Sequence, residues 1–329
     1  MNEKVFASLK SSETEDWVDF HIVRPFSYYW ACGFARIGVH PNTVTVLSMI
    51  FGAASALFFV HGCYYYEGTS GLVTNLFALF LLLIADILDN TDGQLARMTG
   101  QKSRMGRILD GVAGVFWYVP IYAALIVRFY RHHDLEFSWL GLSDTPSNVL
   151  IATCAVFVLA AVSGLWALAG QQRLADYYIQ AHLFFLKGEK GSELDNSIQQ
   201  QQLYDQTPWK GNFIWKVFLR SYVTYTKKQE QITPQFQRLM GLLRSRFGDT
   251  ENIPVSVRQE FHDYSLKLMK YVFMLVFNFR TAYLVLFCLL DVPSLIFVTE
   301  VVLMSLILFY VNHRHESFCR VMADELTQR

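Results

Sequence analysis

Four aspartates lie close together between residues 86 and 110. They are Asp86, Asp89, Asp92 and Asp110. Asp89 and Asp92 are three residues apart and would share one face of a helix, and an antiparallel neighbouring helix would place Asp110 opposite them. Carboxylates held this close repel one another unless a cation compensates their charge. Because no His or Cys lies among them, this oxygen-only set predicts a site for Mg²⁺, or for Mn²⁺ in its place.

Two features of the same stretch leave alternatives open. Ion pairs with Arg97, Arg104 and Arg107 would also compensate the aspartates. Small residues recur through the stretch, and they either let helices approach closely or leave room for a flat ligand. These small residues are Gly93, Ala96, Gly106, Gly111, Ala113 and Gly114.

Six apolar runs have the length that a helix needs to cross a bilayer, because about 20 apolar residues span a ~30 Å hydrocarbon core. They lie at roughly Asn42–Val60, Leu72–Asn90, Leu109–Val127, Val149–Leu168, Leu268–Leu290 and Ser294–Val311. Six such runs in a chain of 329 residues, 53% of them hydrophobic, are too many for a water-soluble core to cover. The sequence predicts an all-α integral membrane protein with a bundle of six transmembrane helices.

The positive charges predict how these spans are oriented. With both termini in the cytoplasm, the outer loops would contain only two basic residues, Arg128 and Arg131. The short inner segment 91–108 would contain four, and Lys and Arg are enriched in cytoplasmic loops. We therefore expect a multi-pass protein with both termini cytoplasmic, in the inner membrane if the cell is bacterial. A formal net charge of zero provides no basic surface for nucleic acid.

The spans divide the chain into five predicted regions. These are a cytoplasmic N-terminus (1–41), spans one to four (42–168), a helical cytoplasmic insertion (169–267), spans five and six (268–311) and a cytoplasmic tail (312–329). Two aromatic-rich stretches, Trp17–Ala35 and Pro208–Tyr225, are predicted to lie along the membrane surface as amphipathic helices, with ordinary packing as the alternative. The glutamine-rich stretch Ser192–Gln206 is predicted to be a polar loop.

The last two spans each contain one charged residue. Arg280 precedes the turn at Asp291–Pro293 by 11 residues and Glu300 follows it by seven, so both lie at similar depth. A buried ion pair is the favoured interpretation. The alternative is that Arg280 binds the phosphate of a substrate.

The aspartates follow a spacing that resembles the signature of the CDP-alcohol phosphotransferase family. The pattern is Asp89-x2-Asp92-Gly93-x2-Ala96-Arg97, eight residues, Gly106-x3-Asp110. The opening of the first span, Pro41-Asn42-Thr43-Val44-Thr45, is also similar to that family, and the resemblance extends from Trp17 to about Leu168.

The resemblance implies a reaction and a set of site residues. Metal ions would hold the diphosphate of a CDP-linked substrate, an alcohol would attack the β-phosphorus, and CMP would leave. Asp89, Asp92 and Asp110 would be the metal ligands. The nucleotide pocket would be lined by Gly93, Ala96, Arg97 and Gly106. The expected partners are a CDP-linked lipid or CDP-alcohol, an alcohol acceptor, membrane lipids and a second copy of the chain, since family members are often dimers.

The sequence departs from the family pattern at Gly114, where the signature has a fourth aspartate that binds the second metal and acts as general base. Asp86 lies one turn below Asp89, and position 114 lies one turn below Asp110 on the antiparallel helix. Asp86 and position 114 would therefore lie at similar depth, which makes Asp86 a candidate replacement base. Alternatively, a phosphate on the acceptor takes the proton, or the chain binds CDP-lipid without catalysis.

The resemblance leaves the donor open. CDP-diacylglycerol with a polar cytoplasmic acceptor is the favoured pair for phospholipid synthesis, and CDP-choline or CDP-ethanolamine with a lipid alcohol uses the same signature. A Mg²⁺ transporter is a different class of function, but it would need acids along a continuous path across the membrane. A non-catalytic lipid-binding subunit is a third class.

Overall fold

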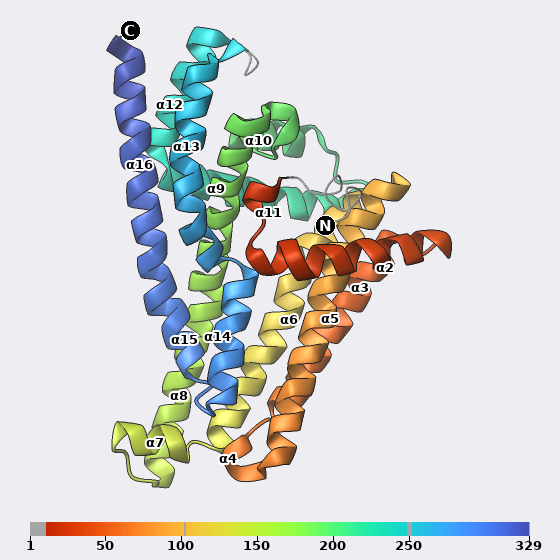
Figure 1. Cartoon of the computed structure of the whole chain (residues 1–329), viewed down its shortest axis with the longest axis vertical. Helices are drawn as coiled ribbons and strands as arrows, with labels where there is room; N and C mark the ends of the chain where they lie inside the picture. The colour runs from red at the N-terminus through yellow and green to blue at the C-terminus, as the bar shows by residue number, and fades with distance from the viewer. Residues whose placement is uncertain (1–10, 102, 249–251, 329) are drawn as a thin grey trace. The chain divides into compact units, whose positions relative to one another are not determined.

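The computed structural model describes residues 11–101, 103–248 and 252–328, and every regular element in these ranges is helical (Figure 1). The described residues form two compact units. The first unit comprises residues 15–168 and 277–303, and the second comprises residues 11–14, 169–276 and 304–328. The prediction of an all-α protein is confirmed for these residues.

The first unit contains the signature. Its α-helices are α2 (Arg24–Arg36), α3 (Pro41–Phe59), α4 (Tyr64–Glu67), α5 (Thr69–Thr99), α6 (Arg104–Arg131), α7 (Asp134–Leu140), α8 (Pro146–Val162), α14 (Phe277–Leu289) and α15 (Leu295–Val298). The helix starts follow from local sequence. Pro41 occupies the first turn of α3, where its missing N–H costs no hydrogen bond, and the Ser103 hydroxyl accepts the Gly106 N–H at 2.9 Å to cap α6.

The second unit contains the predicted insertion. Its α-helices are α9 (Ala169–Lys187), α10 (Ser197–Gln206), α11 (Phe213–Ile232), α12 (Pro234–Phe247), α13 (Val255–Val272) and α16 (Ser305–Gln328). One apolar cluster joins α9, α12, α13 and α16 through Phe185, Phe236, Phe261 and Cys319.

The stretch 192–206, predicted to be a loop, is helical over most of its length, so that prediction is wrong. Asn196 caps α10 by accepting the Ile198 N–H at 2.8 Å. The N–H and hydroxyl of Ser197 donate to Glu230 on α11 at 2.8 and 2.5 Å. A cap and a tertiary contact therefore outweigh the polar composition of this segment.

Long apolar helices occupy the positions of the spans predicted from hydropathy, and the predicted span Leu268–Leu290 is divided between two helices. Five helical runs in the described chain are long and apolar enough to cross a membrane, and a sixth span results if the pair Val255–Leu275 and Phe277–Leu289, bent by 42°, is counted as one. The five runs are Pro41–Phe59, Thr69–Thr99, Arg104–Arg131, Pro146–Lys187 and Leu295–Gln328. Most of these helices continue well beyond the predicted apolar cores, because a helix needs no apolar residues where it leaves the hydrocarbon.

Candidate active site

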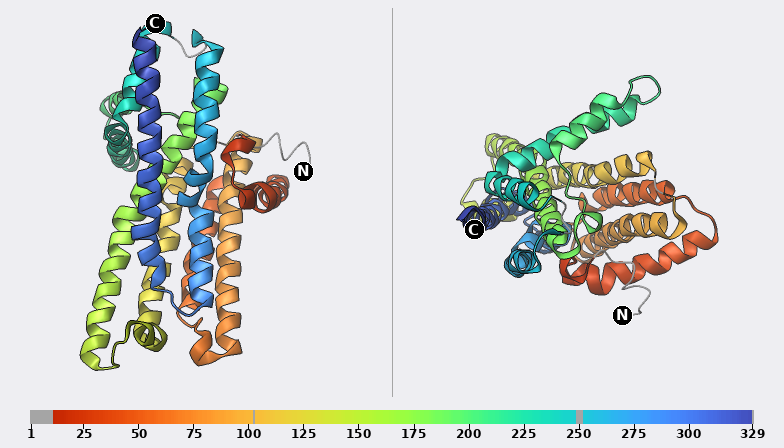
Figure 2. Two further views of the ribbon diagram at one scale, coloured as in Figure 1. Left: turned by 60° about the vertical axis from the view of Figure 1, so that its left-hand side comes forward. Right: turned by 90° about the horizontal axis from the view of Figure 1, so that it is seen from above.

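α3 forms the centre of the three-helix arrangement that positions the signature. It lies between α5 and α6 and packs along both, as the view from above shows (Figure 2). Close approach to α6 requires Gly52, because a Cβ at this position would lie 2.1 Å from the Trp117 side chain. α5 and α6 therefore flank α3, whereas the sequence analysis expected them to pack directly against each other.

The amino-terminal turn of α3 contacts the signature on both sides. The Thr45 hydroxyl donates a hydrogen bond to Asp92 on α5. Asn42 accepts a hydrogen bond from the Ser103 hydroxyl, at 3.3 Å, at the start of α6. A Cβ at Gly106 would lie only 3.0 Å from the Asn42 Oδ1, so a larger residue would displace the Asn42 side chain by a few tenths of an ångström. The Pro41–Thr45 motif thus has a physical role, which is to hold the two halves of the signature.

The signature aspartates are close enough to interact electrostatically. Asp89 interacts with both Asp92 and Asp110. Among the described residues, Asp89 Oδ1 is buried and has no hydrogen-bond partner. The oxygens of the three carboxylates are not all within 4.8 Å of one another. A buried carboxylate oxygen without a donor, beside two further carboxylates, fits the chemistry of a hard divalent cation.

The small residues of the signature have different surroundings. A Cβ at Gly93 would make an ordinary contact, 3.5 Å from Arg97 Nη1. A Cβ at Gly114 would have no atom within 4 Å, so a larger side chain has room there. Ala96 is half-buried, and the exposed Arg97 interacts electrostatically with Asp92 and with Glu15.

Asp86 is buried and lies against the N-terminal segment. Asn90 donates to its Oδ1 at 3.2 Å, and its charged neighbours include Asp19, Arg24 and Asp16. From the sequence, this segment was predicted only to contribute to a surface helix, and its acids were not predicted to belong to the site. The pattern of three acids in Glu15–Asp19, just before that helix, is the signal that was available.

Asp16 organises these N-terminal acids. Its two carboxylate oxygens accept the Asp19 N–H at 2.9 Å and the Asn278 side-chain amide at 2.7 Å. Burial, together with the nearby charge of Asp16, raises the pKa of Asp19 to about 6. Burial also raises the pKa of Glu15, against the opposing effect of its ion pair with Arg24.

Residues 38–185 match the family model described as CDP-alcohol phosphatidyltransferase. No curated protein and no solved structure gave a significant match to the chain. The matched segment contains the whole signature and the Pro41–Thr45 motif. It extends past Leu168, where the resemblance in the sequence became weak, and it begins after the aromatic helix that the resemblance had included.

Beyond the aspartate signature, the first unit contains a buried ion pair between Arg280 and Glu300. Both side chains are 0% exposed, and Arg280 Nη1 lies 2.6 Å from Glu300 Oε1. The hydroxyls of Tyr122 and Ser163 donate to the other oxygen of Glu300. This ion pair is the interpretation that the sequence favoured, and the burial of Arg280 offers no support for its alternative role in phosphate binding.

A second buried network surrounds Arg128, which the sequence analysis placed in an outer loop. In the structure Arg128 belongs to α6 and is 1% exposed. Its guanidinium donates to Asp291 at 2.5 Å and to Asn75 and the Cys288 carbonyl at 2.9 Å each. Asp291 also accepts the backbone N–H of Tyr64 and of Tyr65. Arg128, at the end of the third apolar run, is therefore the ion-pair partner of Asp291, which lies in a turn distant in the sequence.

Proposed function

We propose that this protein transfers a substituted phosphate from a CDP-linked substrate to an alcohol and releases CMP. The match of residues 38–185 to the CDP-alcohol phosphatidyltransferase family supports this reaction. The observation that carries the proposal for the site is the buried, unpartnered oxygen of Asp89 within a group of like charges. The protein itself supplies no donor for that oxygen among the described residues, which is the situation expected of a ligand-binding carboxylate.

Asp89, Asp92 and Asp110 would hold Mg²⁺ or Mn²⁺. The ion, when bound, supplies positive charge for the oxygens of the attacking alcohol and of the departing CMP. The remaining contribution of the protein is positioning. Thr45 fixes the orientation of Asp92, while Asn42 and Ser103 fix the start of the helix that presents Asp110. Gly93, Ala96, Arg97 and Gly106 would line the nucleotide pocket between these helices.

Asp86 would accept the proton of the alcohol, in place of the carboxylate that the resemblance expects at position 114. Its burial, its single side-chain hydrogen bond to Asn90 and its electrostatic interaction with Asp89 support this role. A phosphate group on the acceptor is the alternative proton acceptor. The donor we propose is CDP-diacylglycerol, with a polar alcohol acceptor that approaches from the cytoplasm, where both termini would also lie, in a protein that works as a dimer.

Gly114 itself favours a second candidate function, the binding of a CDP-linked lipid without turnover. A Cβ at this position would have no neighbour within 4 Å, so steric exclusion does not account for the absence of an acid. A protein that lacked the aspartate at this position would keep the other three carboxylates and the nucleotide pocket and lose the transfer step.

The deciding experiment measures Mg²⁺-dependent CMP release by the purified protein from CDP-diacylglycerol, with a panel of alcohols and phosphorylated alcohols. CDP-choline and CDP-ethanolamine with diacylglycerol form the second arm. Release with one acceptor establishes the transferase and identifies the head group. Binding of CDP-diacylglycerol with no release in either arm would replace the transferase by the non-catalytic function.

Asp86→Asn tests the proposed base within the same assay. The variant should lose turnover and retain binding of CDP-diacylglycerol, because the amide keeps the shape of the side chain but accepts no proton. Asp205→Asn, an exposed position on α10, is the matched control and should behave like the unmodified protein. Unchanged turnover in Asp86→Asn would exclude Asp86 as the base.

A further inference from the structure

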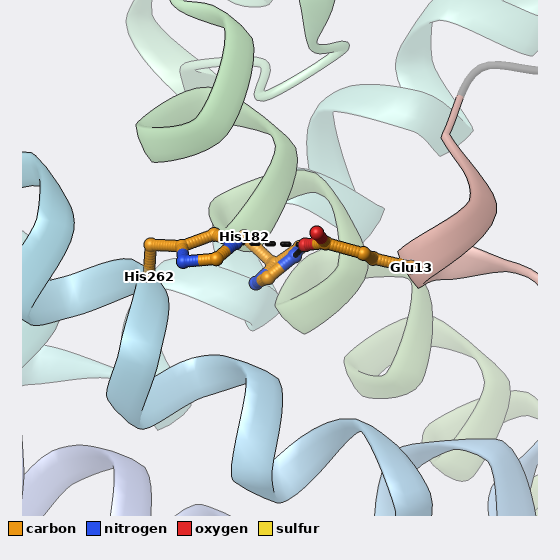
Figure 3. Close-up of side chains that lie close together, drawn as sticks. All are labelled: Glu13, His182 and His262. Carbon is orange, nitrogen blue, oxygen red and sulfur yellow. Dashed lines mark hydrogen bonds and ion pairs between the residues drawn. The ribbon is translucent and has the colours of Figure 1, made fainter.

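Three side chains from distant parts of the chain converge in the second unit, as Figure 3 shows. Glu13 lies in the 3₁₀ turn Ser12–Thr14, His182 lies on α9 and His262 lies on α13. Glu13 Oε2 is 3.1 Å from His182 Nε2 and 2.7 Å from His262 Nε2. The ligand-type atoms of all three residues lie within 4.8 Å of one another.

The hydrogen bonds around His182 determine which of its ring nitrogens carries the proton. His182 Nδ1 lies 2.8 Å from the Ser265 hydroxyl oxygen. That hydroxyl donates its own proton to the His262 carbonyl at 3.1 Å, so it can only accept from His182. With the Ser265 hydroxyl donating to that carbonyl, Nδ1 carries the proton of a neutral ring, and the Nε2 that faces Glu13 presents a lone pair.

His262 is held in the same way. Its Nδ1 lies 3.1 Å from Asp263 Oδ1, which also accepts the Gln259 amide at 2.8 Å. An ionised carboxylate has no proton to donate, so Nδ1 of His262 is also protonated, and in a neutral ring its Nε2 also presents a lone pair to Glu13.

In these neutral tautomers two imidazole lone pairs and a carboxylate oxygen are directed at one point, and they repel one another unless a proton or a metal cation lies between them. Protonation of both rings would supply donors, but it would place two positive charges on rings whose centroids are 5.0 Å apart, one of them on a fully buried side chain. One divalent ion compensates all three groups at once. The outer partners Ser265 and Asp263 are of the kind that orient metal-binding histidines, in which the second ring nitrogen donates to a hydroxyl or carboxylate.

We propose that Glu13, His182 and His262 form a binding site for a divalent first-row transition-metal ion such as Zn²⁺. Two imidazoles and one carboxylate suit such an ion, whereas Mg²⁺ prefers oxygen ligands alone. Metal–ligand bonds of about 2.0–2.1 Å in a tetrahedral site place ligand atoms roughly 3.3 Å apart, close to the separations around Glu13. The site would fix the turn Ser12–Thr14 to α9 and α13. It leaves a fourth position for water or another ligand.

A second group of ligand-type side chains in this unit, His315, Glu316 and Cys319 on α16, provides an internal comparison. Glu316 is already committed, since its two oxygens accept the N–H groups of Gln235 and Phe236 at 2.7 and 3.2 Å. These bonds satisfy the start of α12, so the group has a structural role that needs no ion.

The experiment measures bound zinc by mass spectrometry, together with the thermal unfolding temperature, in purified full-length protein that has been stripped of metal and then supplied with Zn²⁺. Excess Mg²⁺ is present throughout to occupy the carboxylate site of the first unit. We expect one Zn²⁺ per chain and a higher unfolding temperature on Zn²⁺ addition. Substitution of Co²⁺ should give the visible absorption of a tetrahedral centre with nitrogen ligands.

The variants locate the ion. Glu13→Gln and His262→Gln should each lower Zn²⁺ affinity at least about tenfold and remove the thermal shift. Glu13 is partly exposed on a short turn, so its variant should fold even if a histidine variant does not. His313→Gln, an exposed histidine on α16, and Cys319→Ser should both retain the ion. Equal Zn²⁺ binding by Glu13→Gln and the unmodified protein, or its loss only in Cys319→Ser, would overturn the proposal.

Discussion

α5 and α6 each contribute polar or charged residues to two regions that differ in how their charges are compensated. Around Arg128, one cation and one anion meet with Asn75, a carbonyl and two backbone N–H groups, so the buried guanidinium and carboxylate are paired within the protein. Around Asp89, three carboxylates interact, and one buried oxygen has no donor among the described residues. The first arrangement stabilises the fold, and the second is suited to a ligand from outside the chain.

The comparison predicts its largest effect on stability at the paired region. Arg128→Met leaves the buried Asp291 carboxylate without its cation and should lower the free energy of unfolding by about 3–5 kcal/mol. The double variant Arg128→Met/Asp291→Asn should lose less than the sum of the two single changes, because both partners of the pair are removed. Thermal unfolding in detergent checks both. Additive losses would show that the pair is not energetically coupled.

Asp89→Asn should produce the opposite result. Loss of a residue that hydrogen-bonds to a metal ligand typically costs roughly 10–100-fold in activity. CMP release should fall by more than this in Asp89→Asn, because Asp89 would itself be a metal ligand. The unfolding temperature without Mg²⁺ should stay the same or rise, since one of several like charges is removed. A lower unfolding temperature with unchanged CMP release would assign Asp89 a structural role and remove the contrast between the two regions.

Gly114→Asp sharpens the contrast by adding a fourth carboxylate to the region around Asp89. The open space beside Gly114 should accommodate the side chain, and the fourth carboxylate should lower the Mg²⁺ concentration for half-maximal binding by about tenfold. Mg²⁺ titration followed by thermal shift measures this effect. Gly114→Asn has nearly the same shape without the charge and is the control. Equal Mg²⁺ responses of the two variants would show that position 114 does not face the metal site.

The substitution Asp19→Asn should have the smallest effect on the unfolding temperature, and the sign of its pH dependence can be predicted. Because its pKa rises from an ordinary value near 4 to about 6 on folding, the folded protein binds the proton more tightly, and ionisation of Asp19 costs stability as the pH rises from 4 through 6. Asp19→Asn removes this cost. The variant should therefore gain more in unfolding temperature over the unmodified protein at pH 7.5 than at pH 4.5. A difference that is independent of pH would contradict the raised pKa.

Local sequence was sufficient to predict the long apolar helices and the shared helix face of Asp89 and Asp92. Apolar runs of about 20 residues mark spans because the bilayer has a fixed thickness, and helical periodicity places Asp89 and Asp92 on one face. Hydropathy also predicted two charges at one depth, and Arg280 and Glu300 do form an ion pair. Local composition failed at α10, where the cap at Asn196 and the contact between Ser197 and Glu230 stabilise a helix in a polar segment.

Tertiary structure decided which distant residues meet. Hydropathy and periodicity describe each helix alone, so they gave no sign that α3 separates α5 from α6 or that Thr45 bonds to Asp92. They also could not pair Arg128 with Asp291. The clearest case is the set of Glu13, His182 and His262, which are separated by up to 249 positions and fit no linear motif. These three side chains meet because the turn Ser12–Thr14 and the helices α9 and α13 pack together, and contacts between distant segments depend on the whole fold.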